Sequence, residues 1–320
     1  MSPMLHLLWA RLVQAAVVLL LMSYAVYALI GLMPGDPVDL MVSADPRLSS
    51  DDARRLKALY GLDRPLTERW ASWLSAAVAG DLGYSRLYAR PVLEVLLPAL
   101  GNTLRLMGLA LLLALLVAFV AALVAASRPH SLRDFLVNLA AFAGISTPPF
   151  WLALLLIAVF AVWLGVLPAG GSGTLAASSG SAWWRYALLP VATLAFASAG
   201  VYTRYLRGSL LEVLRQDYIR TARAKGAGEA RVLVRHALRN AAIPLVTILG
   251  LELGALFSGA LVTETVFAWP GMGRLIYDAV MGNDFNLAMV GLLLATAVTL
   301  AGSLLADLLY LWLDPRIRYR

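Results

Sequence analysis

Basic side chains gather in one stretch of an otherwise apolar chain, RTARAKGAGEARVLVRHALRN from Arg220 to Asn240. If Gly228 to Leu238 is helical, three arginines fall at i, i+4 and i+8 on one face: Arg231, Arg235 and Arg239. Like charges at this spacing repel by roughly 0.2 to 0.5 kcal/mol per pair, so the row is stabilised only when an anionic surface lies opposite. Two surfaces qualify: lipid headgroups of an inner leaflet, or an acidic or carbonyl-lined groove on a partner protein.

The same helix predicts an apolar stripe on another face, formed by Ala230, Leu233, Val234, Ala237 and Leu238. Just upstream, AKGAG supplies paired glycines for a tight turn. Such a turn lets a short helix project from a membrane surface, which favours the partner protein as the anionic surface.

Other reactive side chains do not form a recognisable site. His6, His130 and His236 are too scattered for a metal site or a catalytic triad, and the absence of cysteine excludes disulfides and thiolate chemistry. The loop sequence GGSG lacks a membrane-embedded base, which disfavours an intramembrane protease. Because G-x-x-x-x-G-K-[ST] is missing, the chain cannot itself bind ATP in that way. We therefore expect no catalytic residue, no metal ligand and no bound cofactor.

Composition identifies a membrane protein, since 61% of the residues are hydrophobic, only 14% are charged and the mean hydropathy is +0.77. A helix needs roughly 20 apolar residues to cross about 30 Å of hydrocarbon. Gaps between charged residues then predict an all-α protein with six transmembrane helices. These helices lie within 12–35, 106–127, 135–167, 186–203, 241–263 and 285–306.

Orientation follows from the distribution of Lys and Arg. An even number of spans puts both termini on one side, and that side holds 15 basic residues, nine of them between Arg204 and Arg239. On the other side, eight basic residues in 33–98 are balanced by nine acids. Both termini and the basic stretch are therefore expected to be cytoplasmic. The net charge of +7 reflects topology and not nucleic-acid binding, and the first span reads as a retained anchor.

Three regions are expected along the chain: the N-terminus and first span (1–32), an extracytoplasmic helical segment (33–98), and a core membrane domain (99–320) with the other five spans, whose cytoplasmic loop covers 208–240. The second region predicts a helix from Ser49 to Tyr60 and another with Pro65 in its first turn. About 65 residues do not easily fold alone, so this segment is expected to form a small cap against the outer ends of the spans.

Several residues within the spans are candidates for the translocation path or a gate. Arg105 and Glu252 lie at similar depths, which predicts a buried ion pair or mutual hydrogen bonding that faces the path; alternatively Arg105 snorkels outward and Glu252 is neutral or meets a second membrane subunit. Pro148 and Pro149 predict a kink, either a hinge or merely structural. Glu264, in ETVFAWPGMG, belongs to an outer gate, a dock for a binding protein or an interfacial aromatic belt.

At family level, QDYIRTARAKGAGEARVLVRHALRNAAIPLVT resembles the EAA loop of permease subunits of binding-protein-dependent ABC importers, in the peptide and nickel branch. Five further stretches resemble that branch in the same order along nearly the whole chain: GLMPGDPVD, YGLDRPLTERWASWLSAAVAGDLGYS, GISTPPFWLALLL, TETVFAWPGMGRLIYDAV and LLYLWLDPRIRY. The chain is most similar to the dipeptide/oligopeptide B-type subunit, which bears a large outer segment after its first helix.

The resemblance implies a type I ABC importer permease in the bacterial inner membrane, which conducts di- or oligopeptides or a related solute such as a nickel chelate. Its partners would be a homologous permease in a heterodimer, two ATPase subunits that bind ATP and Mg, an extracytoplasmic solute-binding protein and the bilayer. A coupling helix would dock on the ATPase through Ala222, Gly226, Gly228, Glu229, Arg231, Val232, Arg235 and His236. The sequence departs from the generic motif at Thr221-Ala222-Arg223, in place of Glu-Ala-Ala, and at Gly228, in place of a serine cap.

One alternative from a different class stays open, a secondary transporter or channel driven by an ion gradient. Such proteins usually place several ionisable groups within their spans. Here only Arg105 and Glu252 lie at depth.

Overall fold

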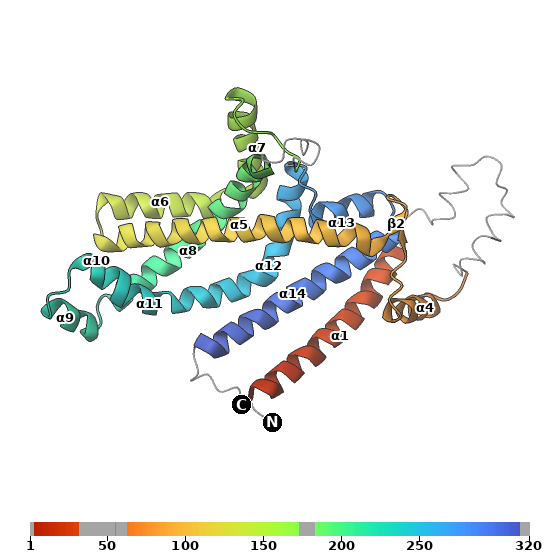
Figure 1. The fold of residues 1–320 in the computed structure, drawn as a ribbon, viewed down its shortest axis with the longest axis horizontal. Helices are drawn as coiled ribbons and strands as arrows, with labels where there is room; N and C mark the ends of the chain where they lie inside the picture. Colours follow the sequence, from red (N-terminus) through yellow and green to blue (C-terminus); the bar gives the residue numbers. More distant parts are fainter. Residues whose placement is uncertain (1–2, 32–54, 56–62, 173–182, 314–320) are drawn as a thin grey trace. The chain divides into compact units, whose positions relative to one another are not determined.

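The computed structural model describes residues 3–31, 55, 63–172 and 183–313, and for 3–7, 247, 250–259 and 309–313 it describes the backbone alone (Figure 1). The chain divides into two compact units. Unit 1 comprises Met1–Leu100 and Leu275–Leu300, and unit 2 comprises Gly101–Arg274 and Ala301–Arg320. Each unit is described by itself below.

Four helices among the described residues are long and apolar enough to cross a membrane. They are α1 (Pro3–Gly31), α5 (Val92–Ser127), α8 (Trp183–Val213) and α14 (Phe285–Leu313). A fifth candidate is the bent pair of α6 (Leu132–Ser146) with α7 (Pro149–Leu156) and the π-helical segment η1 (Ile157–Trp163). These five match five of the predicted spans. The remaining predicted span, 241–263, overlaps α12 (Ile243–Val266). The count of six spans and the cytoplasmic location of both termini stay predictions.

The kink expected at Pro148 and Pro149 is confirmed, and it is a complete break in the helix. The predicted single helix from Phe135 to about Leu167 is broken, and its two halves are bent by 103°. Thr147 and Pro148 both leave the helical region, with ψ of 121° and 130°. Each precedes a proline, whose ring excludes the α conformation from the residue before it. Pro149 then opens α7, where its missing N–H costs nothing.

In unit 1, α4 (Leu66–Val78) packs beside α1. Trp70 Nε1 donates to Ser23 Oγ at 3.1 Å, and the ring of Trp70 meets Tyr24 edge to face at 5.4 Å. Helix α4 confirms the helix predicted after Pro65, while the one predicted from Ser49 to Tyr60 lies outside the described residues. A short antiparallel ladder pairs β1 (Tyr84–Ser85) with β2 (Arg90–Pro91).

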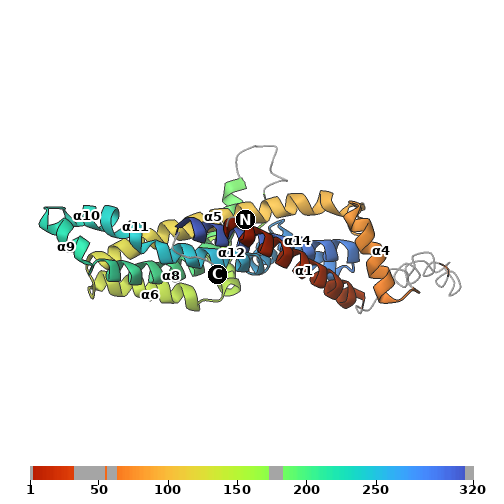
Figure 2. The same ribbon diagram turned by 90° about the horizontal axis from the view of Figure 1, so that it is seen from below.

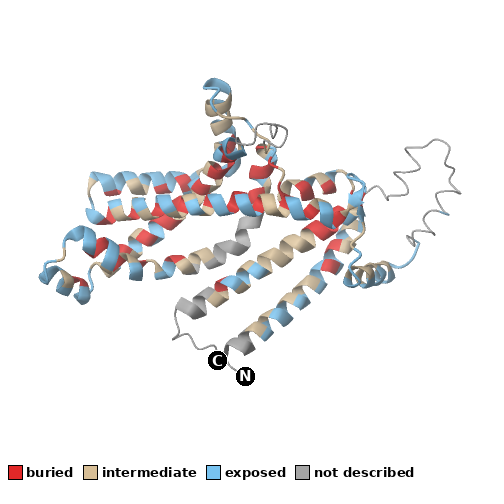
Figure 3. Cartoon of the chain, viewed as in Figure 1, coloured by how far each residue is buried: buried red, intermediate tan, exposed pale blue. Residues whose placement is uncertain are grey.

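In unit 2, α6 and α8 run side by side (Figure 1 and Figure 2). Their backbones approach so closely that a Cβ on Gly144 would lie 2.6 Å from the carbonyl oxygen of Phe196, and one on Gly200 2.5 Å from that of Ala141. Buried stretches occur along both α5 and α8 (Figure 3). Helix α5 contributes an alanine at every fourth position to a buried cluster that it shares with α8, which contains Ala114, Ala118, Ala122, Ala126, Ala195, Ala199, Tyr202, Leu206 and Leu210.

Candidate functional site

The basic stretch folds into a helical loop at the end of α8. It consists of α9 (Asp217–Ala224), α10 (Glu229–Arg231), the π-helical segment η3 (Val232–Ala237) and α11 (Leu238–Ala241) (Figure 1). We call residues 214–242 the basic loop. It leads directly into α12, so it joins two of the long helices of unit 2.

The glycine-rich turn of the basic loop forms as predicted, and it is a Schellman motif. The N–H of Ala227 donates to the carbonyl of Ala222 at 3.2 Å, and the N–H of Gly226 donates to that of Arg223 at 2.9 Å. Gly226 has a φ of 82°, in the left-handed region, and a Cβ there would meet nothing within 4 Å. The dihedral angle, and not lack of space, therefore requires glycine. Ala222 and Gly226 are two parts of one hydrogen-bonded turn.

An exposed ion pair connects the two helices on either side of this turn, α9 and α10. Arg223 donates through Nε and Nη2 to the two carboxylate oxygens of Glu229, at 2.8 and 3.1 Å. The carboxylate raises the pKa of Arg223. Both side chains are exposed, so the pair orients α10 relative to α9 more than it stabilises the fold.

The inner face of the loop differs from the predicted stripe. Ala230 and Val234 are exposed, so the prediction is wrong for these two, whereas Leu233 and Ala237 are buried as expected and Leu238 is half-buried. The cause is the π-helical segment, whose wider turn changes the spacing of the buried positions to Val232, Ala237, Ala241 and Leu245.

This inner face packs onto the two long helices. Val232, Ala237, Ala241 and Leu245 join Ile219 of α9 in the cluster that α5 and α8 share, and none of these five is more than 2% exposed. The basic loop and the long helices α5 and α8 therefore share one buried cluster.

The exposed side of the loop includes the three arginines of the predicted row, whose alignment on one face stays a prediction because the π-helical segment lies between Arg231 and Arg239. Arg231, Arg235 and Arg239 are all exposed, while His236 is half-buried. Gly228 begins α10 with the extended conformation of an N-cap (φ −65°, ψ 154°), and no side chain caps the helix there. The loop thus presents cationic donors outward on a segment that is held by its apolar side. Such an arrangement can bind an anionic or carbonyl-lined surface.

A second polar site lies where α12 ends. Glu264 is fully buried, and its carboxylate accepts from Thr103 Oγ1 at 2.5 Å and from the N–H of Arg274 at 3.1 Å. Thr103 Oγ1 also accepts from the N–H of Met272 at 2.8 Å, so this hydroxyl ties α5 to the start of α13 (Met272–Met281). A Cβ on Gly271 would overlap the carboxylate. Glu264 therefore shapes the turn, and a gate at this turn stays a prediction.

The aromatic residues of this turn are not an interfacial belt. Phe267 and Trp269 are 1% and 5% exposed, packed among other apolar side chains of unit 2. The belt interpretation is thus wrong for both residues, because a belt places its rings at the lipid surface.

Two further predictions concern the Arg105–Glu252 pair and the expected lack of a metal site. Arg105 is exposed, but the side chain of Glu252 lies outside the described residues, so their pairing stays a prediction. Over the described part of the chain, no three His, Asp or Glu residues lie where they could hold a metal ion.

Three polar residues with clear structural roles were not singled out from the sequence: Thr103, Asp134 and Arg207. Asp134 had a local signal, since Ser131 three residues earlier begins the pattern of a helix N-cap. The partners of Thr103 and Arg207 are 161 and 73 residues away, beyond any local pattern.

Comparison with known proteins gives matches along the whole chain. The family described as binding-protein-dependent transport system inner membrane component matches residues 114–319, and its N-terminal counterpart matches residues 4–107. Oligopeptide transport system permease protein AppB of Bacillus subtilis (strain 168) is 39% identical over 289 residues, which cover 89% of this chain and 90% of AppB. Glutathione transport system permease protein GsiC of Escherichia coli (strain K12) is 37% identical over 317 residues, which cover 99% of this chain and 100% of GsiC.

A solved structure agrees on the fold. One chain in the crystal structure of an amino acid ABC transporter with histidines superposes with a TM-score of 0.53, covering 70% of this chain and 94% of that chain at 19% identity. Family matches that account for both halves of the sequence, on a chain built of membrane-length apolar helices, leave one conclusion. The protein belongs to the binding-protein-dependent transport system inner membrane components, as a multi-pass, peptide-type ABC importer permease of the bacterial inner membrane.

Proposed function

We propose that this chain forms a translocation path for small peptides together with a homologous second permease. Two separate ATPase subunits hydrolyse ATP, and an extracytoplasmic binding protein delivers the solute. Relatives that carry oligopeptides and glutathione, by their names, support peptides over nickel chelates.

The observation that carries the proposal is the two-faced basic loop. Arg231 and Arg235 are exposed on one side, while Val232 and Ala237 on the other side are fully buried against the bundle. A row of like charges is favourable only opposite an anionic or carbonyl-lined surface. In the proposed orientation the loop faces the cytoplasm, where an ATPase groove would supply that surface.

The coupling step follows from the packing. Closure of the ATPases on ATP displaces the loop by its outer face, and the shared cluster passes the displacement to α5 and α8. The bundle then alternates between outward and inward access. The Schellman turn at Gly226 and the Arg223–Glu229 pair keep the arginine row in position while it is pushed.

The test is reconstitution of the permease pair in proteoliposomes with its ATPases and binding protein. Uptake of labelled glutathione and of a labelled tripeptide should require ATP and should survive collapse of proton and sodium gradients. Uptake that follows an ion gradient without ATP would instead support the secondary transporter. ATP-driven uptake of neither peptide would make the proposed solute class wrong.

Coupling through the loop is tested by charge reversal. We expect Arg231→Asp with Arg235→Asp to weaken ATPase binding at least about 100-fold, because like charges at an interface cost several kcal/mol. The matched control is Arg215→Asp with Arg220→Asp, which makes the same change of charge on exposed residues outside the row. If the row variant still recruits the ATPases and imports solute normally, the basic residues serve only to orient the chain.

A further inference from the structure

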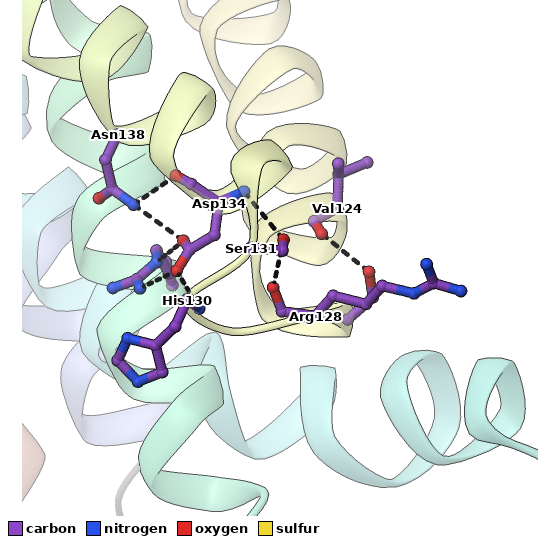
Figure 4. Close-up of polar contacts among 8 residues, drawn as sticks. Val124, Arg128, His130, Ser131, Asp134 and Asn138 are labelled. Carbon is purple, nitrogen blue, oxygen red and sulfur yellow. Dashed lines mark hydrogen bonds and ion pairs between the residues drawn. The ribbon is translucent and has the colours of Figure 1, made fainter.

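An ion pair between a half-buried arginine and a buried aspartate joins α6 to α8, apart from both sites described above (Figure 4). Arg207 of α8 donates through Nε and Nη2 to the two carboxylate oxygens of Asp134, at 2.5 and 2.6 Å. Asp134 is 3% exposed and lies in the first turn of α6. This fork geometry fixes the relative orientation of the two side chains as well as their distance.

The same carboxylate also holds the turn between α5 and α6. It accepts from the N–H of His130 at 2.9 Å and from Asn138 Nδ2 at 2.8 Å (Figure 4). His130 has a φ of 61°, and Ser131 Oγ donates to the carbonyl of Arg128 at 2.6 Å. The backbone of the turn is therefore tied to Asp134, and through Asp134 to Arg207.

Arg207 lies on the helix that receives the basic loop. Its neighbours along α8, Leu206 and Leu210, are fully buried in the cluster that contains Val232 of η3. One side of α8 thus contacts the loop through apolar packing, while Arg207 reaches α6 through a charged bond. A movement of α8 would therefore act on two kinds of contact, the apolar packing with the loop and the ion pair with α6.

These two kinds of contact respond differently to force. Apolar contacts lined by alanine fix no single relative orientation of two helices, since their attraction has no direction. A bidentate ion pair with two further hydrogen bonds cannot shift without leaving the buried carboxylate of Asp134 unpaired. Buried ion pairs are also poor sources of net stability compared with apolar residues. The pair is therefore better explained by the geometry that it imposes than by stability.

We propose that Asp134 and Arg207 are positioning residues that make α6 and the α5–α6 turn move with α8 when the basic loop is displaced. The proposal rests on the proposed function, in which ATP drives that displacement. Without the pair, α8 moves while α6 lags, so ATP is hydrolysed with less solute imported.

The first experiment measures labelled glutathione and tripeptide imported per ATP hydrolysed in proteoliposomes that hold the complete transporter. We expect Asp134→Asn to lower this ratio at least about fivefold, the lower end of typical coupling between sites, while ATPase activity persists. Arg133→Gln is the matched control, since it removes a charge from the exposed neighbouring residue. A merely structural role would lower the amount of transporter and leave the ratio unchanged.

The second experiment needs no solute and uses the absence of cysteine from the chain. Spin labels are attached at Leu132→Cys on α6 and Arg220→Cys on α9, both exposed, and their separation is measured by pulsed electron paramagnetic resonance. In the parent the distribution should stay narrow and unchanged between the nucleotide-free and ATP-trapped transporter. With Asp134→Asn it should shift or broaden in the trapped state.

The outcomes separate the two proposals. If the parent imports neither peptide with ATP, the proposed solute class is wrong, and the distance measurement in the ATP-trapped transporter still decides the role of the pair. If the parent works and Asp134→Asn keeps both the ratio and the distances, the positioning role is wrong. Should Asp134→Asn not accumulate in the membrane, Asp134→Asn with Arg207→Gln removes both charges and replaces it. Failure of that variant too, or an unchanged ratio and distances in it, assigns the pair to folding alone and overturns the proposal.

Discussion

Gly226→Ala isolates the conformational requirement at the centre of the basic loop. Gly226 has a φ of 82°, and a Cβ there would meet nothing within 4 Å, so the substitution changes no packing. An L-residue in the left-handed region costs about 1 to 2 kcal/mol. That cost lowers the population of the folded loop relative to its locally opened forms by about 5- to 30-fold.

The assay is hydrogen exchange of the loop amides in detergent or nanodiscs. Local opening sets the exchange rates, so the amides of Gly226 and Ala227, which donate the two Schellman bonds, should exchange about 5 to 30 times faster. Gly226→Asn should recover part of the protection, because asparagine tolerates this conformation better than alanine.

The control is Gly208→Ala, the same change in the interior of α8. There too a Cβ would meet nothing within 4 Å, but the backbone is helical, so alanine should be neutral or favourable by up to about 1 kcal/mol. Equal loop exchange in the Gly226→Ala and Gly208→Ala variants would refute the reasoning from the dihedral angle.

Other substitutions probe the buried carboxylate and the surface ion pair. Gly271→Ala should destabilise the protein by about 1 to 3 kcal/mol, because the new methyl group overlaps the carboxylate of Glu264; an unchanged melting temperature in detergent would contradict this close contact. Thr103→Val should cost about 1 to 3 kcal/mol in the same melting assay, since it leaves the carboxylate and one N–H without their shared partner, whereas Thr103→Ser should recover most of the loss. Glu229→Gln, which weakens the exposed pair with Arg223, should change stability by less than about 1 kcal/mol, and a larger drop in denaturant titration would show that the pair does more than orient α10.

Features that depend on local sequence could be predicted well. Gaps between charges located the long helices because desolvating a charge limits where a membrane segment can end. The break at Pro148 and the turn at Gly226 followed from the restrictions that proline and glycine place on the backbone. In both cases the cause lies within a few residues of the effect.

Features that depend on tertiary structure could not be predicted in this way. The stripe assigned to Ala230 and Val234 assumed 3.6 residues per turn, and the π-helical segment that displaces it is set by the packing of Val232 and Ala237. Glu264 was recognised as notable, but its partner Thr103 lies on a helix far away in the sequence. Only the folded chain shows that this carboxylate serves a turn.

The alanines of α5 also constrain how this protein can evolve. At Ala114, Ala118, Ala122 and Ala126, a larger residue would overpack the cluster shared with α8 and the basic loop. The exposed Leu112 and Leu116 on the same helix face no such limit. Substitutions along this helix are therefore expected to show a period of four residues, with small side chains retained on one face and variable side chains on the others. In the proposed transporter, the link between the basic loop and the long helices would then depend on the smallest uncharged side chains of α5.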